Sequence, residues 1–129
     1  MLHNLNQPAF TAFSGVTLTA AYTGNRKTFE TGGFSKVSID LVYAMGAAEA
    51  GNTMEFQLEA SSDGTNWHKL VIDTTGLSSV ITPREWQMAP ESLNVIIDVA
   101  YKYMRMSLKE TGVAANFGTA TVNITLSGL

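Results

Sequence analysis

One stretch decides the fold class, Ser61-Ser62-Asp63-Gly64-Thr65-Asn66-Trp67, because it separates two segments of alternating apolar and polar residues. Asp63-Gly64 supplies the positive φ that a tight hairpin turn requires. Asp63, Thr65 and Asn66 carry side chains that hydrogen-bond the backbone of such turns. Trp67 then begins the return strand, and we expect it to anchor the core. The stretch predicts a structural hairpin built on Asp63, Gly64, Asn66 and Trp67, and not an active site.

The segments around this hairpin alternate with the period of two that strands have. Residues 54–60 give the clearest pattern, with Met54, Phe56, Leu58 and Ala60 predicted to face the core and Glu55, Gln57 and Glu59 predicted to face solvent. Similar patterns predict strands at residues 16–22, 34–45, 54–60, 67–72, 80–88, 93–99, 101–109 and 118–127. We therefore predict an all-β fold, an antiparallel two-sheet sandwich of about eight strands that is jelly-roll-like.

Composition narrows the classes of function. The chain has 129 residues, enough for one domain, and its net charge of -3 argues against binding nucleic acid through phosphates. It has no cysteine, which excludes disulfides and thiolate chemistry. No apolar run is long enough to span a membrane, and the first eight residues do not predict a secretory signal.

The chain is poor in charge, with 15% charged residues against about 25% in a typical soluble domain. Its 15 threonines and 14 alanines take the place of the missing charge. Such a composition favours a surface that packs against other subunits. A monomeric β-protein rich in threonine explains the same composition and stays open as the alternative.

The N-terminal region is unusual because the first 25 residues contain no Asp, Glu, Lys or Arg. Residues 1–15 lack clear periodicity, so we interpret them as an arm that precedes a single sandwich domain at residues 16–129. A neutral arm that carries aromatic side chains is poorly solvated when free. We expect Leu5, Phe10 and Phe13 to contact another subunit. The alternative is an arm folded onto its own sandwich.

Residues for catalysis or metal binding are sparse. His68 lacks a recognisable nucleophile and carboxylate pattern around it, and Glu55 and Glu59 lie about 13 Å apart along one strand, which is too far for a glycosidase pair. Residues 63–66 offer oxygen ligands without the spacing of a calcium loop. We expect a protein that is not an enzyme, with no catalytic residue, no metal site and no cofactor.

Three segments together, residues 54–67, 101–106 and 120–126, resemble small β-sandwich virion proteins of tailed bacteriophages. The hairpin also resembles that of discoidin-like, galactose-binding-type domains. The virion resemblance implies a capsid decoration (cement) protein that is made in the host cytoplasm and binds the capsid surface. Its implied partners are the major capsid protein and copies of itself, as a homotrimer. The alternative is a carbohydrate- or receptor-binding module of a phage tail or fibre, which would bind a glycan.

Overall fold

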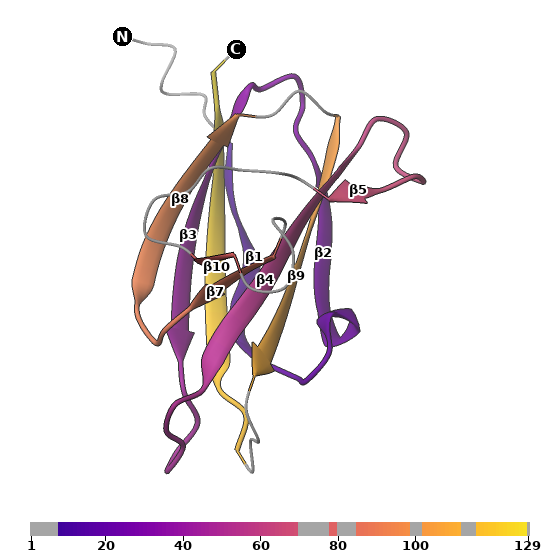
Figure 1. Cartoon of the computed structure of the whole chain (residues 1–129). Coiled ribbons are helices and arrows are strands. Elements are labelled where there is room, and N and C mark those ends of the chain that lie inside the picture. Colours follow the sequence, from indigo (N-terminus) through magenta and orange to yellow (C-terminus); the bar gives the residue numbers. More distant parts are fainter. Residues whose placement is uncertain (1–7, 70–77, 80–84, 99–101, 112–115, 129) are drawn as a thin grey trace, which may run out of the picture.

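The computed structural model describes residues 8–69, 78–79, 85–98, 102–111 and 116–128. Two antiparallel sheets pack face to face, which confirms the predicted all-β sandwich (Figure 1). The strands are β1 (Ala9–Thr17), β2 (Asn25–Glu30), β3 (Lys36–Ala44), β4 (Thr53–Ser61), β5 (His68–Lys69), β6 (Ser78–Ser79), β7 (Glu85–Met88), β8 (Ser92–Asp98), β9 (Tyr103–Thr111) and β10 (Thr119–Ser127). The helical turn η2 (Tyr22–Gly24) precedes β2. Within the described residues, no helix is long and apolar enough to cross a membrane.

The strand order is that of a jelly roll. One sheet has the order β1-β10-β3-β8, and the other has the order β2-β9-β4-β7-β6 with β5 paired to the end of β4. The pairs β1/β10, β2/β9, β3/β8 and β4/β7 are nested and alternate between the two sheets. A long antiparallel hairpin rolled onto itself produces this nesting, so the jelly-roll expectation is confirmed.

The core lies between the sheets and follows from the alternation in the sequence. The four central strands, β3, β4, β9 and β10, direct every second side chain inward, and nearly all of those side chains are apolar. The inward residues of the four central strands are Val37, Ile39, Leu41, Tyr43, Met54, Phe56, Leu58, Ala60, Met104, Met106, Leu108, Ala120, Val122, Ile124 and Leu126, and all are buried. Full burial of each large apolar side chain stabilises the fold by roughly 1.5–3 kcal/mol.

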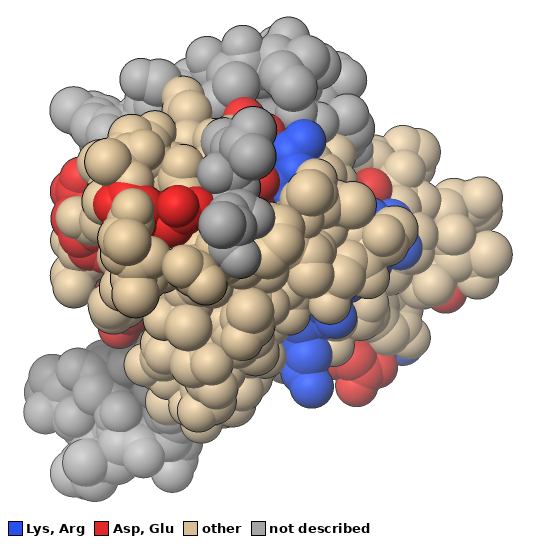
Figure 2. Space-filling view, turned by 90° about the horizontal axis from the view of Figure 1, so that it is seen from below, with Lys and Arg blue, Asp and Glu red and all other residues tan. Residues whose placement is uncertain are grey.

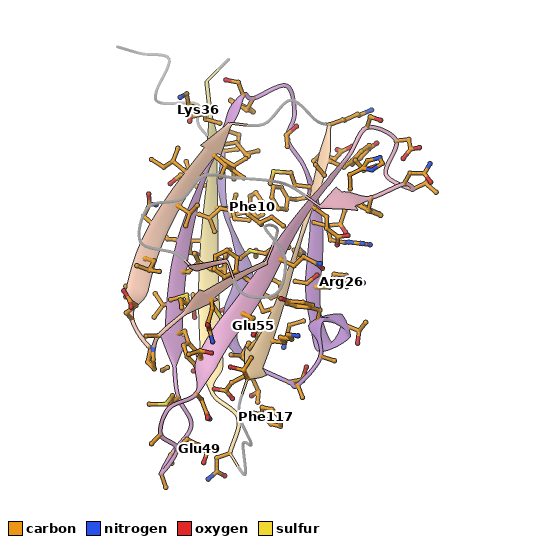
Figure 3. The ribbon with its side chains drawn as sticks, in the orientation of Figure 1. Phe10, Arg26, Lys36, Glu49, Glu55 and Phe117 are labelled. Atoms are coloured by element: carbon orange, nitrogen blue, oxygen red, sulfur yellow. The ribbon has the colours of Figure 1, made fainter. Side chains whose placement is uncertain are left out.

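The first strand corrects the predicted domain boundary at residue 16. β1 begins at Ala9 and pairs with β10, so residues 9–15 belong to the sandwich. Phe13 is 6% exposed in the core of its own chain. Phe10 packs against that core with its ring 5.3 Å from the ring of Phe29, between the sheets (Figure 3). Neither phenylalanine is therefore displayed on a free arm, and Leu5 lies outside the described residues.

Two irregularities in β1 explain why its alternation is hard to recognise. The pairing with β10 shifts register between Thr11 and Phe13 and again between Phe13 and Val16. Gly15 lies in the second interval with a φ of 57°. Each bulge inserts an extra residue and breaks the period of two. The strand predicted at 16–22 is consequently wrong in its bounds, because β1 ends at Thr17.

The outward side chains of β4 are not exposed to solvent as the sequence predicts. Glu55, Gln57 and Glu59 do point away from the core, but they are only 4%, 6% and 8% exposed. β4 is a central strand, with β9 on one side and β5 and β7 on the other. Lys109 and Arg105 of β9 lie against the carboxylates of Glu55 and Glu59. The three side chains are buried, so their predicted exposure to solvent is wrong.

Candidate functional site

The hairpin at residues 61–67 has the construction that its sequence predicts. Gly64 has a φ of 78°, and the Asp63 carboxylate accepts backbone N–H groups from Thr65 (2.8 Å) and Asn66 (2.9 Å). The Asn66 amide donates to the other oxygen of the same carboxylate at 2.8 Å. These hydrogen bonds, those from the Asn66 and Thr65 backbone first, lower the pKa of Asp63 well below its usual range. The carboxylate is thus engaged in holding the turn.

Trp67 differs from its prediction because it is half-buried and lies on the outer side of the sheet rather than in the core. The guanidinium of Arg105 stacks over the Trp67 ring, with its central carbon 4.5 Å from the ring centroid. Arg105 also binds Glu59, with Nε at 2.9 Å and a terminal nitrogen at 2.8 Å from the same carboxylate oxygen. The tryptophan therefore covers an ion pair instead of filling the sandwich interior.

A second aromatic, cation and carboxylate set lies further along β4 and β9. Lys109 Nζ is 3.3 Å from the Glu55 carboxylate and 4.6 Å from the centroid of the Tyr22 ring. Glu55 lies over the middle of β4 in Figure 3. Because Glu55 faces Lys109 and Glu59 faces Arg105 in the β4/β9 register, both pairs are direct cross-strand neighbours. We name Glu55, Glu59, Arg105 and Lys109 the charge array.

The geometry of the charge array favours a structural role for its carboxylates. Each one is paired with its own cation, and four residues along one strand separate Glu55 from Glu59 by about 13 Å. Cooperating carboxylates in glycoside hydrolysis stand about 5–9.5 Å apart. Such pairs hold the sheet and fix the hairpin side chains.

A buried acid connects the two sheets at one end of the sandwich. Tyr43 on β3 donates its hydroxyl hydrogen to one oxygen of Glu110 on β9, and the Gly118 N–H donates to the other oxygen at 2.9 Å. Glu110 is 3% exposed. Burial, followed by the hydrogen bond and charge of Glu110, raises the pKa of Tyr43 above its ordinary value. Glu110 was not among the expected sites, although it continues the inward pattern of Met104, Met106 and Leu108.

The outer side of the four-stranded sheet is open to solvent and nearly neutral. Its outward side chains in β3, β8 and β10 are mostly small hydroxyl and amide groups, and two large apolar side chains, Val42 and Ile96, are exposed among them. Cross-strand hydrogen bonds order part of it, from Thr11 to Asn123 (2.7 Å) and from Asn94 to Asp40 (2.6 Å). The end of the sandwich seen in Figure 2 is also largely neutral, with charges in small separate groups.

Groups that could bind a metal do not gather in the described part of the chain. No cluster of three or more His, Asp or Glu side chains occurs there. His68 is exposed on β5.

Comparison with known proteins adds no family assignment. No model of a protein family matches the chain, and no curated protein matches it.

Proposed function

We propose that this protein is a structural virion subunit, a capsid decoration (cement) protein that stabilises the head of a tailed bacteriophage. It acts through broad contacts with the major capsid protein and with its own copies, and not through catalysis. It is made in the host cytoplasm and resides on the capsid surface. The jelly-roll sandwich and the charge-poor composition support this role.

One observation carries the proposal: the outer sides of the two sheets differ in how many charged side chains they present. On the six-stranded sheet, the charged groups of β4 and β9 bind each other within the fold. The outer side of the four-stranded sheet presents mostly hydroxyls, amides and the exposed Val42 and Ile96, and its exposed charged side chains in the described strands are Lys36 and Asp40, of opposite sign. Protein interfaces are depleted in charge at their centre and need good shape complementarity. The outer side of the four-stranded sheet is suited to a protein partner, whereas Glu55, Glu59, Arg105 and Lys109 are paired with one another within the fold.

The test is attachment to capsids. Purified protein is mixed with heads assembled from the major capsid protein alone and sedimented, and the heads are then heated with and without it. We expect saturable binding that survives about 0.5 M salt, because burial is screened less than exposed charge pairs are. Heads that carry the protein should resist a higher temperature. Protein that stays in the supernatant at every concentration would contradict the proposal.

A carbohydrate- or receptor-binding module of a tail or fibre is the second candidate. The half-exposed Trp67 ring beside the hairpin is the observation that favours it, since aromatic rings stack on sugars. Arg105 already covers one side of that ring. A glycan array with the wild-type protein and the Trp67→Ala variant separates the candidates, because only the second candidate expects binding that the substitution removes.

A further inference from the structure

The tip of the hairpin carries a pair of residues that is prone to a spontaneous chemical change. Asp63-Gly64 is the one Asp-Gly pair in the sequence, and both residues are exposed. In such a pair the backbone nitrogen of the glycine can attack the carboxyl carbon of the aspartate, because glycine has no Cβ to hinder the approach. The sequence alone therefore makes Asp63 the aspartate at which this attack meets the least steric hindrance.

The change has two steps and needs no reactant other than water. The Gly64 nitrogen bonds to Cγ of Asp63, and the hydroxyl of the neutral carboxyl group leaves as water together with the amide proton, which closes a succinimide ring. Water then opens the ring at either carbonyl carbon. Addition at Cγ restores aspartate, whereas addition at the main-chain carbonyl carbon breaks the original peptide bond and leaves isoaspartate, in which the chain runs through the side chain.

Both reacting groups are bound to other partners in the folded hairpin. The Gly64 N–H donates to the Ser61 hydroxyl oxygen at 2.9 Å, and that hydroxyl donates to one Asp63 carboxylate oxygen at 2.9 Å. The same carboxylate oxygen accepts the backbone N–H groups of Thr65 and Asn66. The Asn66 side-chain amide donates to the other oxygen at 2.8 Å. Ser61, which contacts both the nitrogen and the carboxylate, is fully buried.

We propose that Asp63-Gly64 is a site of spontaneous isomerisation that the closed hairpin protects, so that isoaspartate forms only in molecules whose hairpin has opened. The hydrogen bond from Gly64 to Ser61 has to break before the nitrogen turns toward Cγ of Asp63. Local opening of this kind costs less than global unfolding. The hydrogen bonds to the carboxylate also hold the pKa of Asp63 well below its usual range, so the neutral acid that loses water is scarce while the hairpin is closed.

The product does not fit the hairpin from which it forms. Isoaspartate lengthens the main chain at the turn by a carbon atom and turns the side-chain carboxylate into a main-chain carbonyl. The N–H groups of Thr65 and Asn66 then lose the acceptor that holds the turn. We expect modified molecules to stay open at the hairpin and to lose the stacking of Arg105 on Trp67. The isoaspartate content of a sample thus records past openings of the hairpin, whether or not the protein binds capsids.

The test measures isoaspartate at Asp63 in the full chain. Samples are incubated at about pH 5, where an ordinary aspartate carboxyl is partly protonated, and the peptides that contain Asp63 are then separated and identified by mass spectrometry. The folded wild type should accumulate isoaspartate at least about tenfold more slowly than the same chain unfolded in concentrated urea, because only the open fraction reacts. Equal rates in the two states would overturn the inference.

Two variants and a matched control locate the protection in the hairpin. Ser61→Ala removes the hydroxyl that binds both reacting groups, so the folded variant should isomerise about tenfold faster than wild type. Asn66→Ala removes an exposed donor to the carboxylate and should give a smaller increase, which decides the test if Ser61→Ala does not fold. Ser62→Ala is the control, because the Ser62 hydroxyl is exposed and hydrogen-bonds no described residue.

Circular dichroism and thermal unfolding verify that each variant is folded during the incubation. Ser62→Ala should isomerise at the wild-type rate. An unchanged rate in the folded Ser61→Ala and Asn66→Ala variants would overturn the inference, as would an increase in Ser62→Ala as large as theirs.

Discussion

Tyr43→Phe removes a single hydroxyl group and should destabilise the fold far more than its size suggests. The Tyr43 hydroxyl is the donor to one oxygen of Glu110, which is 3% exposed. Without it, a buried carboxylate oxygen loses its partner, while the phenyl ring still fills the same space. Hydrogen bonds to charged groups contribute about 1.5–3 kcal/mol. We therefore expect the free energy of unfolding to fall by about 2 kcal/mol.

Urea denaturation followed by tryptophan fluorescence measures this loss. With a slope near 2 kcal/mol per molar urea, the midpoint should fall by about 1 M at unchanged slope. Tyr103→Phe is the control, because the Tyr103 ring lies on the outer side against Gly64 and its hydroxyl hydrogen-bonds no described residue. In the double variant Tyr43→Phe with Glu110→Leu, the summed single losses should exceed the measured loss by at least about 1 kcal/mol. A Tyr43→Phe loss below about 0.5 kcal/mol would refute this account.

The pH dependence of the same variant has a defined sign. The folded state raises the pKa of Tyr43, so above about pH 10 the unfolded chain releases this proton first. The stabilisation is present below pH 10 and is lost as the pH rises further. The wild type should consequently lose stability more steeply than Tyr43→Phe between pH 10 and 11. Parallel curves in that interval would contradict the assignment.

Three further changes test other parts of the structure. Phe13→Ala should lower the free energy of unfolding, measured by thermal denaturation, by about 3–5 kcal/mol because Phe13 lies in the core. A loss below about 1 kcal/mol would contradict this placement and would favour a contact of Phe13 with another subunit. Trp67→Ala should lower the free energy of unfolding, measured in urea, by less than about 2 kcal/mol, since the half-buried ring mainly covers Arg105. A larger loss would indicate that Trp67 contributes to the core. Asp63→Ala should lower the denaturation midpoint at pH 7 because the wild-type stabilisation needs an ionised carboxylate whose pKa is lowered in the folded state. The difference from wild type should be constant above about pH 5 and should shrink steadily as the pH falls below about 4. A difference at pH 2 as large as that at pH 7 would exclude this cause.

The fold class and most of the core could be predicted because regular strands have a strict period. Val37, Ile39, Leu41 and Tyr43 alternate with polar residues, and all four are buried. The hairpin was predictable for a similarly local reason, since Gly64 and the Asp63 side chain determine the turn with neighbours only a few residues away. The strand alternation and the hairpin turn each depend on a short stretch of chain, so the order of residues in that stretch is enough to predict them.

The features that pattern analysis missed depend on residues that are distant in sequence. The β1 bulges hide Phe10 and Phe13 among irregular spacing, and only the pairing with β10 shows that they belong to the core. Glu55 and Glu59 are buried beside Lys109 and Arg105, which are their direct neighbours on β9. The size of Trp67 predicts a place in the core, whereas the ring lies on the outer side of the sheet against the guanidinium of Arg105, on another strand.

The nested pairing of the strands has a consequence for how the chain folds. β10 is the central neighbour of both β1 and β3, and its contact with β1 joins residues 112 positions apart, as between Thr11 and Asn123. A nascent chain cannot complete the four-stranded sheet until β10 has left the ribosome, because β10 lies between β1 and β3. Closing such distant ends is entropically costly before any contact compensates for it. Folding should therefore be slow for a domain of this size, in the range of milliseconds to seconds, and the four-stranded sheet should form only after β10 has been synthesised.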